Sequence, residues 1–190
     1  MKKRVLIFVA LGVVLCWLCI GLISLSAMIV AGAKALPVIA QQYQGLNQMR
    51  RELGSQPPDT ASAREALPTQ VGPYTLNTET VSPIEVFYGF HVDDDAYTGT
   101  YSGPDGEIEL TIIRARSPGG AANYVKVKLG WVDSNLSGTQ SYIIEPEQGL
   151  VLYSSPEVHG RTWNSQEWVV SIEADTKEAR DEFFEALPYR

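Results

Sequence analysis

The distribution of apolar residues divides the chain into three parts. Val5–Val30 is an uncharged run of 26 residues, VLIFVALGVVLCWLCIGLISLSAMIV. A more polar region, 33–72, follows it, and from residue 73 to residue 190 short apolar segments alternate with polar turns. This order predicts a membrane-spanning helix, a connecting region and one folded domain.

The uncharged run is long enough to cross a bilayer. A helix of 26 residues is about 39 Å long, and the hydrocarbon core is about 30 Å thick. Three basic residues precede the run and only Lys34 closely follows it, so the positive-inside rule places the N-terminus in the cytoplasm. We therefore expect a cytoplasmic stub at 1–4, a transmembrane anchor at 5–32 that contacts the lipid bilayer through residues 5–30, and an extracytoplasmic remainder.

The same start also fits a cleaved signal peptide. Ala31-Gly32-Ala33 matches an A-x-A cleavage site. However, the apolar region of a signal peptide usually has only about 7–15 residues. The length of the run therefore favours an uncleaved signal anchor, and N-terminal sequencing of the membrane fraction would decide between the two.

The region 33–72 is expected to hold the domain away from the bilayer. Ile39, Leu46 and Leu53 recur every seven residues, which predicts a juxtamembrane helix. The same spacing allows a short coiled coil, so a homodimer through residues 36–53 is a further candidate. Gly54–Gly72 is rich in Pro, Ser, Thr and Ala and is predicted to be a linker.

Alternating apolar and polar residues in 73–190 predict an antiparallel sheet with one solvent-facing side. In Glu107–Ala115 the aliphatic residues occupy every second position at first, and Gly103–Gly106 is a turn sequence that joins this segment to Tyr97–Ser102. The other expected strands are Tyr74–Thr80, Ile84–His91, Thr139–Glu145, Gly149–Ser154 and Arg161–Ala174, the last broken by a turn at Asn164–Gln166.

Two helices complete the predicted domain. Ser117 followed by Pro118 is a typical helix start, and apolar residues follow it at spacings of three and four. Asp175 and Glu178 form a capping box before the second helix. The element order β-β-β-β-α-β-β-β-α predicts an α+β fold, in which a twisted antiparallel sheet carries both helices on one side.

Charge and cysteine content exclude several functions. The formal net charge is −7, and the first 34 residues hold four of the 15 basic residues and none of the 22 acidic ones. The exported part is therefore strongly acidic, which argues against nucleic-acid binding. Cys16 and Cys19 both lie in the predicted anchor, so the exported part has no disulfide, thiol nucleophile or cysteine metal site.

No motif with a defined chemistry is present. His91 lies beside an acidic turn and His159 lies in a predicted loop, and neither is accompanied by the three or four ligands of a metal site. The run Asp93–Pro104 does not match the EF-hand pattern. There is no G-x-S-x-G, P-loop or dinucleotide motif. We therefore expect no catalytic activity, no cofactor and no metal.

Aromatic residues are the remaining candidates for a binding surface. Tyr97 and Tyr101 share one face of a predicted strand, and Trp163 adjoins a turn. Exposed Tyr and Trp side chains are common at contacts with proteins and amphipathic ligands. These three residues are the predicted ligand or partner surface.

The sequence resembles known proteins in two respects. The segment YTGTYSGPDGEIELTIIRARSPGGAANYV, residues 97–125, resembles photosystem-accessory-like sheet domains. The whole layout resembles uncharacterised bacterial single-pass membrane-anchored proteins with a small exported α+β domain. Neither resemblance implies any site residue.

The leading functional hypothesis is a membrane-tethered extracytoplasmic binding or interaction domain, without catalytic activity, whose partner is a protein or a small ligand. Two alternatives stay open. One is a carrier of a small apolar ligand held between helix and sheet. The other is an enzyme with a dispersed site that uses His91 or His159 with a carboxylate.

Overall fold

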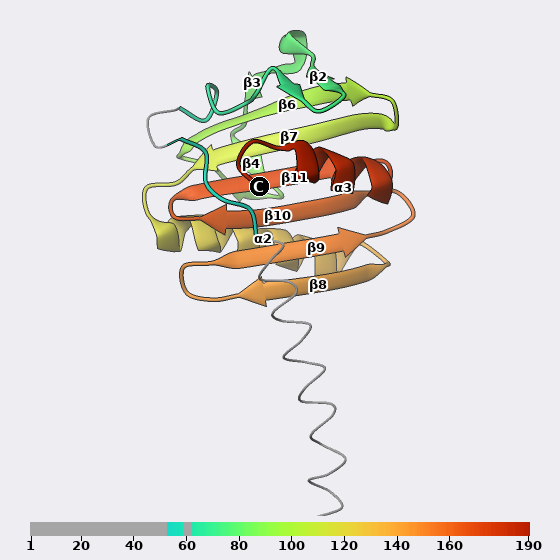
Figure 1. Cartoon of the computed structure of the whole chain (residues 1–190). Coiled ribbons are helices and arrows are strands. Elements are labelled where there is room, and N and C mark those ends of the chain that lie inside the picture. Colours follow the sequence, from blue (N-terminus) through green and yellow to red (C-terminus); the bar gives the residue numbers. More distant parts are fainter. Residues whose placement is uncertain (1–52, 59–61) are drawn as a thin grey trace, which may run out of the picture. The chain divides into compact units, whose positions relative to one another are not determined.

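The computed structural model describes residues 53–58 and 62–190, which belong to one compact unit. The anchor predicted at 5–32, and the predicted juxtamembrane helix as far as residue 52, lie outside the described residues. Within the described part, no helix is both long and apolar enough to cross a membrane. The described residues form an α+β domain built on a large antiparallel sheet (Figure 1).

The sheet contains nine strands within the described residues. In spatial order, eight of them are β1 (Gln70–Val71), β2 (Tyr74–Leu76), β6 (Asp95–Gly103), β7 (Gly106–Arg114), β11 (Trp168–Ala174), β10 (His159–Ser165), β9 (Gly149–Ser154) and β8 (Thr139–Ile144). The ninth, β3 (Ser82–Pro83), pairs with β6, and η1 (Thr78–Thr80) lies between β2 and β3 in the chain. A separate hairpin consists of β4 (Val86–Phe87) and β5 (Phe90–His91).

Two predicted turns are confirmed. The β6–β7 hairpin closes with Gly103 opposite Gly106, and its ladder extends to Asp95 opposite Arg114. The turn predicted at Asn164–Gln166 does separate β10 from β11, but it lies at residues 166–167, where Gln166 adopts a left-handed φ of 53°. Strands β7 and β11, one long strand of each hairpin, pair with each other in the middle of the sheet.

Both helices begin with a side-chain cap. The Ser117 side chain accepts a hydrogen bond from the Gly120 amide at the start of α2 (Pro118–Asn135), as predicted. The cap of α3 (Lys177–Ala186) is Thr176, which accepts from the Ala179 amide at 3.1 Å. The predicted cap, Asp175, is one residue too early, because both residues have capping side chains and the backbone path decides which one reaches the free amides.

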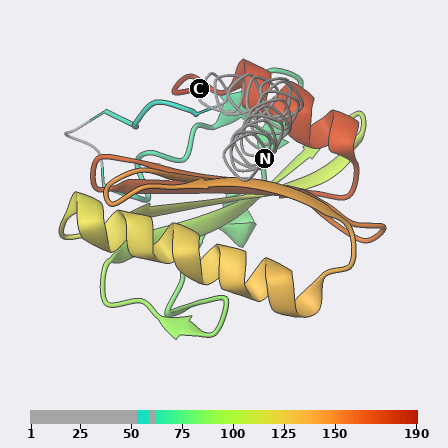
Figure 2. The same cartoon turned by 90° about the horizontal axis from the view of Figure 1, so that it is seen from below.

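The prediction that both helices pack on one side of the sheet is wrong. In Figure 2, α2 and α3 lie on opposite faces. Successive residues of a strand point to opposite faces, and in β11 Val170 belongs to the core under α3 while Val169 belongs to the core under α2. A central sheet with apolar residues on both faces needs a cover on each of them.

The segment predicted as a linker is partly core. Its residues Ala63, Ala66, Leu67 and Val71 are buried with α3 against the sheet. The Tyr101 hydroxyl donates to the Pro68 carbonyl oxygen, 2.8 Å away. Composition predicts flexibility, but these apolar side chains fill space that α3 alone leaves uncovered. The domain therefore begins before residue 73.

Candidate functional site

On the face of the sheet under α2, one row of opposed residues crosses the neighbouring strands β7, β11, β10 and β9 and contains three polar side chains. Glu109 of β7 lies opposite Glu173 of β11, and Glu173 lies opposite Gly160 of β10. Gly160 in turn lies opposite Tyr153 of β9. A Cβ atom at Gly160 would lie 2.0 Å from the Tyr153 ring, so glycine there lets this ring cross the strand toward Glu173.

A second row on the same face, two residues further along each strand, consists of residues with hydroxyl groups. Its members, from β6 to β10, are Thr98, Thr111, Ser171 and Thr162. The Thr111 hydroxyl donates to that of Thr98 at 3.1 Å, and the hydroxyls of Thr162 and Ser171 are 2.7 Å apart. These polar groups satisfy one another beneath the helix, which limits the cost of burying them.

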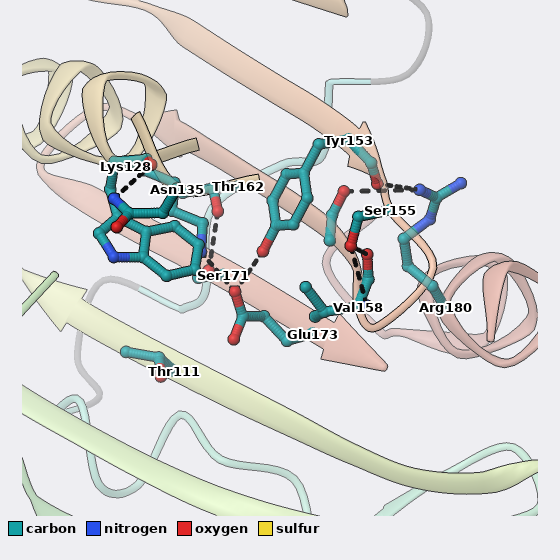
Figure 3. Close-up of polar contacts among 12 residues, drawn as sticks. Thr111, Lys128, Asn135, Tyr153, Ser155, Val158, Thr162, Ser171, Glu173 and Arg180 are labelled. Atoms are coloured by element: carbon teal, nitrogen blue, oxygen red, sulfur yellow. Dashed lines mark hydrogen bonds and ion pairs between the residues drawn. The ribbon is translucent and has the colours of Figure 1, made fainter. Parts of the chain in front are cut away.

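Helix α2 delivers a lysine to the charged row. Lys128 follows Val125 by three residues and precedes Val132 by four, so it shares their inward stripe. Its side chain is 0% exposed, and its ammonium group pairs with the Glu173 carboxylate. The Tyr153 hydroxyl donates to the same carboxylate oxygen (Figure 3).

Three aromatic rings surround the ammonium group. Lys128 Nζ lies 3.3 Å from the centroid of the Tyr88 ring, 4.6 Å from that of Trp131 and 4.7 Å from that of Tyr153. Electron-rich ring faces attract a cation, and more strongly when water is excluded. The charge of Lys128 is thus shared between one carboxylate and a cage of rings.

Burial dominates the electrostatics of this cluster. It lowers the pKa of Lys128 to about 8, although Glu173 and Glu109 act in the opposite direction. Burial alone would raise the pKa of Glu173, but Lys128, together with the hydroxyls of Tyr153 and Tyr88, outweighs it and holds that pKa below its usual value. Burial and then Glu173 raise the pKa of Glu109. At neutral pH we therefore expect a charged Lys128–Glu173 pair.

Tyr88 connects the cluster to the β4–β5 hairpin. It occupies the turn with a left-handed φ of 50°, next to Gly89 with a φ of 83°. A tyrosine in this region is uncommon and strained, so the surrounding contacts must hold it there. Those contacts are the Lys128 ammonium and the Trp131 ring, whose centroid is 4.8 Å from that of Tyr88.

The hairpin also packs along α2 through its phenylalanines. The centroids of Phe87 and Phe90 lie 5.9 Å and 5.6 Å from that of Tyr124, both edge to face. Phe87 is buried, but Phe90 is still 41% exposed and Val86 is 60% exposed. We name the exposed Val86 and Phe90 side chains the hairpin patch.

The cluster and the patch differ in what they can do chemically. Lys128 and Tyr153 are closed off from solvent in this conformation, and their polar atoms are engaged. The arrangement therefore fixes the hairpin on α2, while the hairpin patch is the part that a second molecule can reach.

The structure places the three predicted surface residues on the other face, in or against the α3-side core. Tyr101 is 0% exposed and its ring packs on Phe183 at 5.0 Å. Trp163 is also 0% exposed, and its indole N–H donates to the Ser55 carbonyl oxygen at 3.3 Å. Tyr97 is partly buried against the same core. The segment before residue 73, which was expected to be a linker, and α3 cover this face.

The two histidines lie in different parts of the fold. His91, in β5, is 3.1 Å from the Asp93 carboxylate and is exposed. His159 begins β10 opposite Ala174, on the face that α3 covers. Among the residues that the structure describes, no three His, Cys, Asp or Glu side chains are grouped to hold a metal ion.

Sequence reasoning missed both Lys128 and Tyr88. The sequence did contain a signal for Lys128, because a lysine within the apolar stripe Val125–Val132 must either extend its ammonium group to solvent or pair it with a buried partner. Tyr88 had none, because its role depends on a left-handed backbone and on Lys128, which lies 40 residues later in the chain.

Comparison with known proteins yields one structural likeness. No protein-family model matches the sequence, and no curated protein matches it. The fold is similar to the crystal structure of a GTP-binding regulator from Thermotoga maritima, with a TM-score of 0.57 and 19% sequence identity. The match covers 73% of this chain and 92% of that chain. At this identity the likeness shows a shared fold.

Proposed function

We propose that this chain is a membrane-tethered binding domain outside the cytoplasm, that it acts without catalysis, and that it contacts a protein partner through the hairpin patch. The buried Lys128–Glu173 ion pair serves to hold the hairpin in place. The uncharged run near the N-terminus and the basic residues before it support the tether and its orientation.

The observation that carries the proposal is the exposure of Val86 and Phe90 on a fixed hairpin. A flexible loop would lose conformational entropy on binding, whereas Tyr88, Phe87 and Phe90 already anchor this one on α2. Aromatic and aliphatic side chains on a preformed surface are typical anchors of protein contacts.

The surroundings of the patch indicate the chemistry of the partner. Glu85 and Asp93 are exposed on either side of the hairpin. Arg116 is engaged by Asp94 and by the Asp93 carbonyl oxygen. A partner with an apolar depression and a rim of lysine or arginine would complement an apolar tip flanked by carboxylates. The likeness to a GTP-binding regulator is in keeping with a binding role in general terms.

The test is photo-crosslinking of the full chain in intact cells. A benzophenone amino acid replaces Glu85 in one protein and Lys126, an exposed residue of α2, in the control. We expect a discrete product with another protein from position 85, and its loss when Val86→Ser and Phe90→Ser are added. Protease added outside the plasma membrane should also remove the C-terminal domain.

Equal products from positions 85 and 126, or a product at position 85 that survives both serine substitutions, would contradict the proposal that the partner binds at the hairpin patch. A domain that stays protected from external protease would contradict the orientation. Tryptophan fluorescence of each purified variant checks that loss of the product does not come from unfolding.

A further inference from the structure

The two edges of the large sheet differ in how they are protected. One edge is divided among β1, β2 and β3, which have two or three residues each, and β3 contains Pro83. Short strands and proline at an edge prevent pairing with another chain. The other edge is β8, which has six residues and no proline or charged residue: Thr-Gln-Ser-Tyr-Ile-Ile.

The β8–β9 hydrogen bonds determine which backbone groups of β8 point away from the sheet. The Glu145 amide donates to the Gln148 carbonyl oxygen at the turn that joins β8 to β9. Hydrogen-bonded and non-hydrogen-bonded pairs alternate along an antiparallel ladder. Thr139, Ser141 and Ile143 therefore bond to β9, and the N–H and C=O groups of Gln140, Tyr142 and Ile144 point outward.

No strand among the described residues pairs with this outer side. The Tyr142 side chain, on the α2 face of the strand, is 52% exposed. A continuous, uncharged edge with an exposed aromatic residue is the type of edge that accepts a further strand.

We propose that the occupant of this edge is β8 of a second copy of the chain, paired antiparallel about a two-fold axis. The rest of the exported part is strongly acidic, so a strand that meets its own copy must avoid acid-on-acid pairs. With Tyr142 on the axis, Gln140 lies opposite Ile144 and Glu145 lies opposite Thr139, so no carboxylate faces another.

This register also explains the exposed tyrosine. A two-fold axis perpendicular to the sheet keeps both α2 helices on one face, so Tyr142 meets Tyr142 of the second copy on that face. Cross-strand aromatic pairs stabilise antiparallel sheets. Both copies are tethered to one bilayer in the proposed function, which raises their local concentration. The edge pairing itself does not depend on the hairpin patch.

The first test is disulfide scanning in membrane vesicles. The full chain carries Cys16→Ser and Cys19→Ser, which leaves no native cysteine, and single cysteines replace residues 139–144 in turn. On oxidation we expect dimers that peak at Tyr142→Cys, the one position that lies opposite itself in this register, with at least a ten-fold lower yield from Ser82→Cys on the protected edge. A flat profile, or a yield no higher than that of Ser82→Cys, would overturn the proposal.

The second test blocks the edge without touching the β8–β9 ladder. Tyr142→Pro removes an outward-pointing N–H, which an edge strand tolerates, whereas Tyr142→Thr keeps it. In detergent, light scattering should give a halved protein mass for the proline variant alone. A dimer that persists in Tyr142→Pro, such as one formed through residues 36–53, would show that β8 is not the interface.

Discussion

Lys128 keeps its charge inside the fold because a carboxylate and three ring faces replace water around it. Helix α2 directs the side chain inward between Val125 and Val132. Glu173 and Tyr153 meet it from the sheet, and Tyr88 closes the group from the hairpin. At the scale of single residues, this cluster joins the hairpin, α2, β9 and β11, which are distant from one another in the sequence.

The protonation of Lys128 should couple stability to pH. Its folded pKa is about 8, and the unfolded value is about 10.4. Between these values the unfolded chain binds a proton that the folded chain lacks, so the free energy of unfolding rises with pH, by up to about 1.4 kcal/mol per pH unit. Urea unfolding of the full chain in detergent, between pH 7 and pH 10, measures this rise.

Lys128→Met is the reference for that measurement. It leaves Glu173 without its cation, so we expect the free energy of unfolding at pH 7 to fall by about 3 kcal/mol. The rise with pH between about 8 and 10 should also disappear, because the titrating group is absent. The same pH dependence in both proteins would contradict the lowered pKa of Lys128.

At the scale of elements, glycines have opposite roles in β10 and α2. Gly160 lets the Tyr153 ring cross the strand, because any Cβ there would overlap the ring. Gly130 lies within α2, is exposed, and has nothing within 4 Å of its Cβ position. One glycine is required by packing, and the other only weakens its helix.

Alanine substitution at the two glycines should therefore change stability in opposite directions. Gly160→Ala displaces Tyr153 from Glu173 and should destabilise the domain by about 2 kcal/mol or more. Gly130→Ala should stabilise it by about 0.5–1 kcal/mol, because alanine loses less backbone entropy in a helix. Midpoints of urea unfolding compare the two. A Gly160→Ala variant as stable as the unmodified protein would contradict the packing of Tyr153 on Gly160. A destabilised Gly130→Ala variant would contradict the view that this glycine only weakens its helix.

The predictability of the elements follows the range of the interactions that form them. Strands β6 and β7, their turn, and the Ser117 cap depend on neighbours in the sequence, and each was predictable. The cap of α3 was misplaced by one residue, since Asp175 and Thr176 can both cap. The exposure of Tyr97, Tyr101 and Trp163 depends on which segments cover the sheet, and local patterns carry no information on that.

At the scale of the molecule, the sheet is a central layer with a different cover on each face. Helix α2 and the β4–β5 hairpin cover one face. Helix α3 and the segment around Leu67 cover the other. The segment before residue 73 is therefore part of the folded unit, and it cannot be removed without exposing the core.

Leu67→Ala tests this domain boundary. Leu67 is buried with Tyr101 and Phe183, so we expect the substitution to lower the free energy of unfolding by about 2–4 kcal/mol. Thr69→Ala, at an exposed position two residues later, should change it by less than about 0.5 kcal/mol. Urea unfolding of the full chain measures both. An equally small effect at Leu67 would restore the interpretation of this segment as a linker.

The sequence by itself determined the α+β class, the β6–β7 hairpin and the start of α2, because these depend on period-two and period-3.6 patterns and on local capping. It did not determine the β4–β5 hairpin, because the segment from Ile84 to His91 alternates like one strand but turns at Tyr88 and Gly89. It also determined the acidic charge and the absence of cysteine after the predicted anchor. Only the tertiary structure decided which face each helix covers, which aromatic residues are buried, and how Lys128, Glu173 and Tyr88 meet. Those outcomes depend on competition between distant segments for the same apolar surface, which no local pattern records.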